Sequence, residues 1–313
     1  MPHATPPGGG ARARAAHGPP YCSPTARPGV ARARVDGVPP VGACEIAARA
    51  ADEEPVRAPA HPWETPLLVV CVLVGALVTT ALVHILWTVT GSWACAAVAA
   101  VGPPAACWTA RGLRYARERA ESVKISPTQF PEAYRAVVTL SAAMGLLRPP
   151  EAYVRPTRAR AATDAAAHRL RRYLVLSHEL FAPDGRPRDT DALAFLLAHQ
   201  IGHVAAGHTS FWRRVATLGA EAVPGLGSAL SRATEYTADN HAYAHHPEGA
   251  HAVRLFAGGP ELYPRVNMGE MADRARTDRG GSLLLYHLLS RRPSNTRRMA
   301  ALRDRKRRGR LFL

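Results

Sequence analysis

Cysteine is scarce in this sequence and is absent from its larger part. The five cysteines all lie within the first 107 residues: Cys22, Cys44, Cys71, Cys95 and Cys107. No two of them form a Cys-x-x-Cys pair, so we expect no zinc site built from thiolates. We also expect no disulfide framework in residues 108–313, because that part of the chain contains no cysteine.

Lysine is nearly absent as well, since Lys124 and Lys306 are the only two in the chain. Arginine therefore supplies almost all of the positive charge, and the formal net charge is +16. Such a charge indicates an acidic partner, either nucleic acid or an anionic membrane surface. The sequence contains no recognised nucleic-acid reader motif, so we expect no specific nucleic-acid partner and favour the membrane.

Charged residues are missing from two neighbouring apolar stretches. Residues 66–90 contain no Asp, Glu, Lys or Arg and are long enough to cross ~30 Å of hydrocarbon as a helix. Residues 92–110 are also uncharged, but Gly102-Pro103-Pro104 predicts a kink or a re-entrant segment there. The sequence thus predicts two transmembrane helices within residues 63–120.

Arginines flank this pair of stretches on both sides. Under the positive-inside rule both ends then face the cytoplasm, which predicts a multi-pass protein of the cell membrane with a cytoplasmic catalytic domain. If residues 92–110 fail to cross, that domain lies on the opposite side. The orientation therefore depends on the second helix.

The remaining chain divides into two basic tails and one folded domain. Residues 1–62 are rich in Pro, Gly, Ala and Arg and have no hydrophobic period, which predicts a disordered basic tail. Residues 303–313 predict a second basic tail, either solvated or on a membrane surface. Residues 127–302 predict a mainly helical α+β domain with a small sheet.

Within this domain, apolar spacing predicts a helix over residues 130–147. Short strands are expected at residues 152–154 and 173–176, and the segment from 158 to 172 is ambiguous. A capped helix is expected to begin at Thr190-Asp191. The apolar run after it leads directly into a histidine pair.

His199 and His203 lie four residues apart on that helix, so both imidazoles are on one face and can reach a single tetrahedral ion. With 14 histidines in 313 residues, about 0.6 such pairs arise by chance, and His241 and His245 form another. Two features distinguish the first pair. A run of apolar residues precedes it in the sequence, and the small residue Gly202 permits close helix packing.

A third ligand for the first pair is available further along the chain. Glu235 belongs to the segment Glu-Tyr-Thr-Ala-Asp and is expected to reach the metal from a second helix. Asp239, one turn later, is placed to accept a hydrogen bond from a ligand histidine and so to fix its tautomer. Taken alone, Glu235 and Asp239 also fit a solvated helix face. The donor set of two histidines and one carboxylate favours Zn²⁺.

These residues resemble a known family pattern over roughly residues 127–302. The frame Leu-Leu-Ala-His-x-x-Gly-His-Val-x-x-Gly-His ends at His208, and residues 231–239 read Ser-Arg-Ala-Thr-Glu-Tyr-Thr-Ala-Asp. The chain resembles the HtpX-like and CAAX prenyl protease-type membrane zinc metallopeptidases, peptidase family M forty-eight. The resemblance implies a helical zincin-like domain, Zn²⁺, and an endopeptidase that acts on membrane or misfolded polypeptides.

The chain departs from the family at three positions. Gln200 stands where the family has its catalytic glutamate, and an amide cannot act as a general base. Arg292 replaces a histidine before Pro293 and is interpreted as a cationic contact to a substrate oxyanion. Thr163-Asp164-Ala165 replaces an Asn-Ala strand beside the cleft. Three functions stay open: a zinc endopeptidase with a polypeptide substrate, a zinc-stabilised pseudopeptidase that binds a polypeptide client, and a basic membrane-surface scaffold without a metal. The oligomeric state is not predicted.

Overall fold

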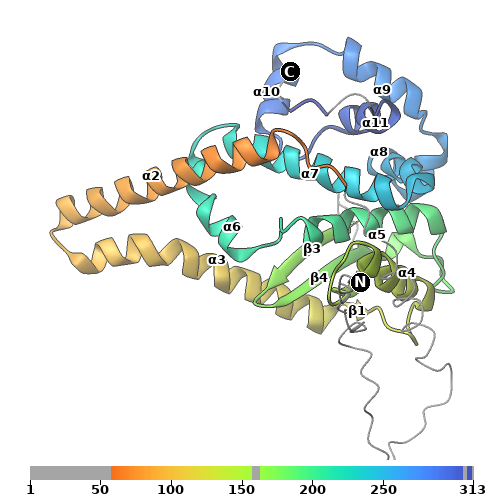
Figure 1. The fold of residues 1–313 in the computed structure, drawn as a ribbon, viewed down its shortest axis with the longest axis horizontal. Coiled ribbons are helices and arrows are strands. Elements are labelled where there is room, and N and C mark those ends of the chain that lie inside the picture. Colours follow the sequence, from red (N-terminus) through yellow and green to blue (C-terminus); the bar gives the residue numbers. More distant parts are fainter. Residues whose placement is uncertain (1–57, 157–162, 306–308, 312–313) are drawn as a thin grey trace, which may run out of the picture.

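A computed structural model describes residues 58–156, 163–305 and 309–311 of the chain, and Figure 1 shows their arrangement. The molecule is mainly helical with one small mixed sheet, as the sequence predicts. Most of the predicted N-terminal tail lies outside the described residues. Its last part does not behave as a tail, because His61 is buried and its backbone N–H donates to Thr237 Oγ1 at 2.9 Å.

Two long apolar helices form a hairpin that projects from the rest of the molecule (Figure 1). Helix α2 spans Glu64–Thr90, helix α3 spans Trp93–Glu121, and Gly91 makes the turn between them at φ 63°. Both are long and apolar enough to cross a membrane. Only 17% and 11% of their most apolar 18-residue windows are buried, whereas the core helix of a soluble protein is mostly buried.

Helix α3 continues through Pro103 and Pro104 and ends at Glu121. The prediction of a re-entrant segment at this point is wrong, because the chain does not turn back there (Figure 1). A proline removes one backbone donor from a helix, and the hydrogen bonds on either side are enough to keep this helix continuous. One continuous helix therefore carries both the uncharged stretch and the arginine-rich stretch.

The sheet has four strands in the order β1-β2-β4-β3. They span Val123–Lys124, Glu151–Arg155, Thr163–His168 and Arg171–Ser177 for β1 to β4. Strand β4 is parallel to β2 and antiparallel to β3. The two predicted strands are confirmed as parts of β2 and β4. The ambiguous segment supplies β3, which forms one edge of the sheet.

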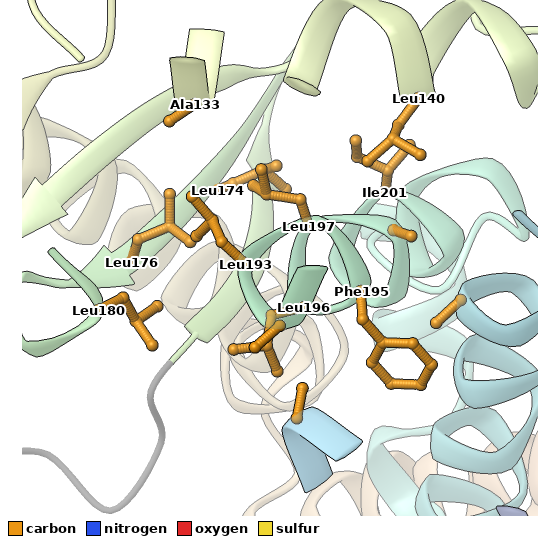
Figure 2. Close-up of a cluster of buried hydrophobic side chains, with 14 of the residues drawn as sticks. Ala133, Leu140, Leu174, Leu176, Leu180, Leu193, Phe195, Leu196, Leu197 and Ile201 are labelled. Carbon is orange, nitrogen blue, oxygen red and sulfur yellow. The ribbon is translucent and has the colours of Figure 1, made fainter. Parts of the chain in front are cut away.

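Helix α5, Thr190–Ala205, crosses the centre of the molecule between the sheet and helix α7, Leu226–His245 (Figure 1). Its leucines meet the buried face of the sheet and helix α4, Pro131–Ala143 (Figure 2). The predicted start at residue 190 is confirmed, and the capping side chain is Asp189, which accepts from the Ala192 N–H at 2.9 Å. Since α5 is covered on both sides, 11 of its 16 residues are buried.

The remaining elements surround α5 and α7. They are η1 (His178–Leu180), α6 (Phe211–Ala216), η2 (Leu218–Ala222), η3 (Pro247–Arg254), α8 (Leu255–Leu262), η4 (Tyr263–Arg265), α9 (Met268–Thr277), α10 (Gly281–Leu289) and α11 (Asn295–Arg303). Helices α5 and α7 approach closely at Gly202, where an added Cβ would lie 2.7 Å from the Cβ of His241. The predicted role of Gly202 in close packing is confirmed.

Of the basic tail expected for residues 303–313, either solvated or on a membrane surface, the structure describes residues 303–305 and 309–311. Leu311 is buried in a cluster with α2 and α7, and its carbonyl oxygen accepts from Arg232 Nε at 2.9 Å. The fully buried Arg232 also donates to the carbonyl oxygens of Leu288 and Ser290 at the end of α10. An apolar residue that follows the basic run thus anchors this part of the chain.

Candidate metal centre

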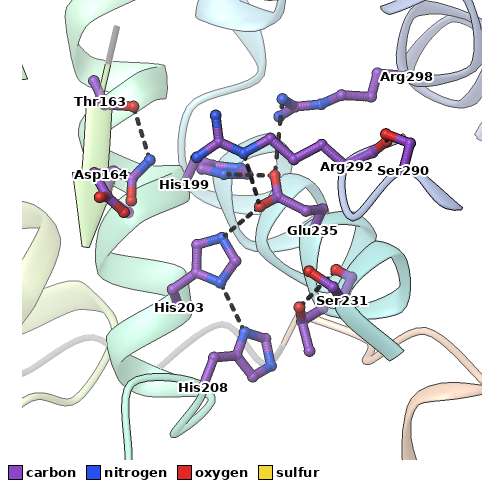
Figure 3. A network of polar contacts seen from close by, with 12 residues as sticks. Thr163, Asp164, His199, His203, His208, Ser231, Glu235, Ser290, Arg292 and Arg298 are labelled. Carbon is purple, nitrogen blue, oxygen red and sulfur yellow. Dashed lines mark hydrogen bonds and ion pairs between the residues drawn. The ribbon is translucent and has the colours of Figure 1, made fainter. Parts of the chain in front are cut away.

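Helices α5 and α7 bring the three predicted ligands together. His199 Nε2 lies 3.6 Å from Glu235 Oε2, and His203 Nε2 lies 3.8 Å from Glu235 Oε1. The three ligand atoms are within 4.8 Å of one another, so the group could hold a metal ion. Figure 3 shows both imidazoles pointing from α5 toward the carboxylate on α7. The predicted convergence of these side chains is confirmed.

The donor atoms are of the types that a tetrahedral cation binds. Bonds of ~2.1 Å at tetrahedral angles place two ligand atoms ~3.4 Å apart, and the three ligand atoms here, which lie within 4.8 Å of one another, would have to move slightly closer around such an ion. Two imidazoles and one carboxylate are also a donor set that catalytic zinc sites use, with a fourth position left for water or substrate.

Asp239 contacts the far side of His199, as the sequence predicts. Its Oδ1 lies 2.8 Å from His199 Nδ1, so the ring's Nε2 is the atom turned toward Glu235. The same carboxylate receives two hydrogen bonds from Arg298, one of them from Nε at 3.0 Å. Asp239 and Arg298 are both buried. This pair fixes the orientation of the first histidine.

The second histidine is held by residues that the sequence interpretation did not assign to the site. His203 Nδ1 lies 2.9 Å from His208 Nδ1, and His208 Nε2 lies 2.9 Å from Glu64 Oε1. Glu64 also accepts from Arg213 at 2.8 Å and from Thr237. His208 is therefore a buried link and is not solvent-facing.

Proton positions follow from this chain of contacts. If His208 Nε2–H donates to the Glu64 carboxylate, the neutral His208 ring accepts at Nδ1. His203 Nδ1–H then donates to that nitrogen, which leaves the lone pair of His203 Nε2 facing Glu235. This is the tautomer that a metal ligand needs.

The electrostatics of the site separate the roles of its two histidines. Burial favours the neutral ring of His199, but contacts with Asp239 and Glu235 outweigh it and raise the pKa of His199. Burial and the charge on His199 lower the pKa of His203 to about 3. Burial opposes ionisation of Glu235, yet both histidines and Arg298 lower its pKa. A cation that binds here therefore competes with protonation of His199, because a metal ligand must be the neutral ring.

A cleft of about 820 Å³ lies over these residues, between strand β3 and the segment that follows α10. Gln200 lies at its edge, where its Nε2 donates to Thr163 Oγ1 at 2.7 Å (Figure 3). Among the described residues that line the cleft, the carboxylates are Glu235 and Asp164. Asp164 forms an ion pair with Arg114. No unpaired carboxylate of the described lining therefore replaces the missing general base.

Arg292 also lines the cleft, in the segment that follows α10. Its Nε is 3.9 Å from Glu235 Oε1, and half of its side chain is exposed. The guanidinium is thus close to the metal ligands and accessible from the cleft. Its contact with a substrate oxyanion stays a prediction.

The comparison pair His241 and His245 behaves differently. The two rings are stacked with their centroids 6.3 Å apart, and among the described residues no third potential ligand joins them to form a metal-binding group. Burial and the neighbouring His245 lower the pKa of His241 to about 4. Of the two histidine pairs, the first therefore has a third potential ligand among the described residues and the second does not, in agreement with the preference drawn from the sequence.

Comparison of the chain with protein-family models, with curated proteins and with solved structures gives no match. The function of the chain is therefore inferred from the geometry of the site and from the motif resemblance. The fold and the site together define a coarse class. The protein is mainly helical, has two apolar helices, and carries a His-His-Glu group that could bind a metal ion.

Proposed function

We propose that this protein is a membrane-anchored, zinc-metalloendopeptidase-like protein that binds an extended polypeptide over His199, His203 and Glu235 and hydrolyses its peptide bonds. The observation that carries the proposal is the convergence of these three donors at the bottom of a cleft. The resemblance to the membrane metallopeptidases of family M forty-eight supports the zincin-like assignment of the domain. Helices α2 and α3 would anchor it in the membrane.

Zinc at this group would supply a Lewis acid that polarises a carbonyl oxygen and activates water. The residues of the chain hold and orient the ligands. Asp239 and Arg298 fix His199 from one side, and His208 and Glu64 fix His203 from the other. Such outer partners typically change metal affinity 10- to 100-fold when they are removed.

Strand β3 provides a surface for the polypeptide. It is an edge strand, so the backbone groups on its outer side have no strand partner within the described sheet. Ala165 and Ala166, which are half-buried, line the cleft from this strand, and their small side chains leave room for an approaching backbone. An extended peptide can add to such an edge through main-chain hydrogen bonds, which is a common mode of peptide recognition.

A second candidate function, a pseudopeptidase that binds polypeptides without cutting them, is favoured by Gln200. Its amide is engaged with Thr163 and cannot take a proton from water at neutral pH. Loss of a general base typically slows a reaction ~10²- to 10⁴-fold. Zinc would then stabilise a binding module, and any hydrolysis would be slow.

One paired experiment separates these functions. We would purify the full chain and its Gln200→Glu variant in detergent, measure bound zinc by elemental analysis, and assay cleavage of an unfolded protein with and without a chelator. The peptidase proposal expects zinc in both proteins and chelator-sensitive cleavage by the wild type. The pseudopeptidase expects zinc in both and cleavage by Gln200→Glu alone.

A matched control is Gln129→Glu, which adds the same carboxylate on the loop before α4, away from the cleft. It should leave both zinc content and cleavage at wild-type levels. Absence of zinc from the wild type and from Gln200→Glu, under conditions where the chain is folded, would refute the proposed metal centre. Zinc in both proteins without cleavage by either would leave a binding function and refute the peptidase.

A further inference from the structure

A second cavity, of about 770 Å³, lies between the two apolar helices and the short helix η2. Its volume is within the ~300–1,000 Å³ range of ligand pockets. We call it the helix groove. Most of its walls are apolar, and they include Val78, Leu82, Ala99, Pro103, Ala106 and Leu218. Helices α2 and α3 diverge from their turn toward the domain, so the groove lies where they separate (Figure 1).

Three arginines line the helix groove: Arg111 and Arg114 from α3, and Arg214 from α6. Arg111 donates to the carbonyl oxygen of Thr209 at 2.7 Å, and no carboxylate of the described residues forms an ion pair with it. Its electrostatic neighbours include the like charges of Arg114 and Arg214. The groove thus combines apolar walls with a cluster of guanidinium groups.

The carboxylates near this cluster do not balance its charge. Asp164 pairs with Arg114, and Glu221 is shared between Arg214 and Arg291. Two carboxylates therefore serve three arginines, and Arg111 adds a fourth guanidinium without one. Next to apolar helices an uncompensated charge is costly, so the cluster favours an anion.

We propose that the helix groove binds an anionic phospholipid, with an acyl chain between α2 and α3 and the phosphate at Arg111. Guanidinium groups bind phosphate oxygens through paired hydrogen bonds, and they repel the trimethylammonium group of a zwitterionic lipid. Occupancy by a lipid rests on the proposed membrane insertion of α2 and α3. It does not depend on zinc or on peptide hydrolysis.

Because of where the arginines lie, a lipid bound in the helix groove would also affect the cleft over the candidate metal centre. Arg111 and Arg114 line both the helix groove and the cleft over the metal centre. A phosphate held there lies at the boundary between the two cavities. The headgroup therefore neutralises the membrane end of the cleft, next to the ion pair of Arg114 with Asp164 on strand β3.

The test measures which lipid the full chain retains. The chain is first washed with alkaline carbonate in its membranes, then purified, and exchanged into micelles with equal amounts of phosphatidylglycerol and phosphatidylcholine of the same acyl chains. Retained lipids are counted by native mass spectrometry. We expect at least a fivefold preference for phosphatidylglycerol, since one arginine near a membrane surface contributes about this factor.

Three variants make the result specific. Arg111→Gln should lose the preference, and Ala106→Trp, which fills the groove, should retain neither lipid. Arg117→Gln on the same helix should keep the wild-type preference, because Arg117 is exposed, pairs with Glu121 and does not line the groove. Circular dichroism of each variant establishes that it is folded.

Equal retention of the two lipids by the wild type would overturn the lipid site. An equal loss of preference in Arg111→Gln and Arg117→Gln would also overturn it, because that result indicates general attraction to a basic surface. Release of the chain by carbonate would refute membrane insertion and the lipid site together. A carbonate-resistant chain without a headgroup preference refutes the lipid site alone.

Discussion

Glu64 and His208 are 144 positions apart in the sequence, and Glu64 Oε1 lies 2.9 Å from His208 Nε2. Glu64 is the first residue of apolar helix α2, and His208 contacts the candidate ligand His203. The hairpin and the metal centre therefore share one buried chain of polar groups. Displacement of α2 would disturb the ring of His203, one of the three candidate metal ligands.

This chain predicts that His208→Leu weakens zinc binding. Leucine removes the acceptor for His203 Nδ1–H, so the ring loses the partner that fixes its tautomer and orientation. We expect the zinc dissociation constant to rise 10- to 100-fold, measured by competition with a chromophoric chelator. His208→Asn offers a carbonyl oxygen in place of the nitrogen and should recover part of the affinity.

His178→Leu is the matched control, because His178 lies on η1 and does not line the metal cleft. It should bind zinc as the wild type does. Unchanged affinity in His208→Leu would show that His203 is oriented without this link.

The buried pair of Arg298 and Asp239 predicts a large effect on stability. Arg298→Met leaves a buried carboxylate without its cation, and breaking such a pair typically costs about 3 to 5 kcal/mol. The free energy of unfolding, measured with denaturant in detergent, should fall by that amount. Arg274→Met removes an exposed pair with Asp278 and should change it by less than about 1 kcal/mol.

The lowered pKa of His203 predicts that, in the presence of a chelator, the free energy of unfolding decreases as the pH is lowered. The folded pKa is about 3 and the usual value is 6.5, so below pH 6.5 the unfolded chain takes up a proton that the folded chain does not. Stability is therefore lost as pH falls, by about 1 kcal/mol between pH 6.5 and 5.5.

The other histidine of the site does not cancel this loss. The pKa of His199 is raised, so the stability it contributes is fully present below pH 6.5. Denaturant unfolding of wild type and His203→Phe at both pH values provides the measurement. A slope that persists unchanged in His203→Phe would assign the pH dependence to other groups.

The sequence was sufficient to predict the pairing of His199 and His203 with Glu235. Helical spacing places the two histidines on one face, and an apolar run of residues before them predicts a buried helix. Gly202 signalled the close approach of α5 and α7, which is what brings Glu235 within reach. These signals are contained in short segments of the sequence, and the structure confirms the helix and the close packing that they predict.

Strand β3 and the polar chain at Glu64 were not predictable in the same way. Residues 158–172, which contain β3, are rich in Ala and Arg, and the place of β3 at the sheet edge depends on its pairing with β4. Glu64 lies just before the uncharged stretch in the sequence. Its carboxylate, at the start of an apolar helix, is the sequence feature that could have indicated a buried polar contact. Its partners come from residues far along the chain, which spacing alone cannot identify.

Thr163 provides the last prediction, which concerns a chain made active by Gln200→Glu. In the wild type Thr163 Oγ1 accepts a hydrogen bond from the Gln200 amide. A glutamate at this position would instead accept from the Thr163 hydroxyl. A hydrogen bond to the charged form lowers the pKa of a carboxyl group, so Thr163 would help to keep the new base ionised.

Adding Thr163→Val to Gln200→Glu should therefore raise the pKa of that glutamate. We expect the acidic limb of the kcat/KM profile for peptide cleavage to move up by about one pH unit, because a hydrogen bond to a charged group contributes roughly 1.5 kcal/mol. Thr209→Val, another threonine that lines the cleft, should leave the limb in place. A limb that does not move with Thr163→Val would mean that the glutamate takes its hydrogen bond elsewhere.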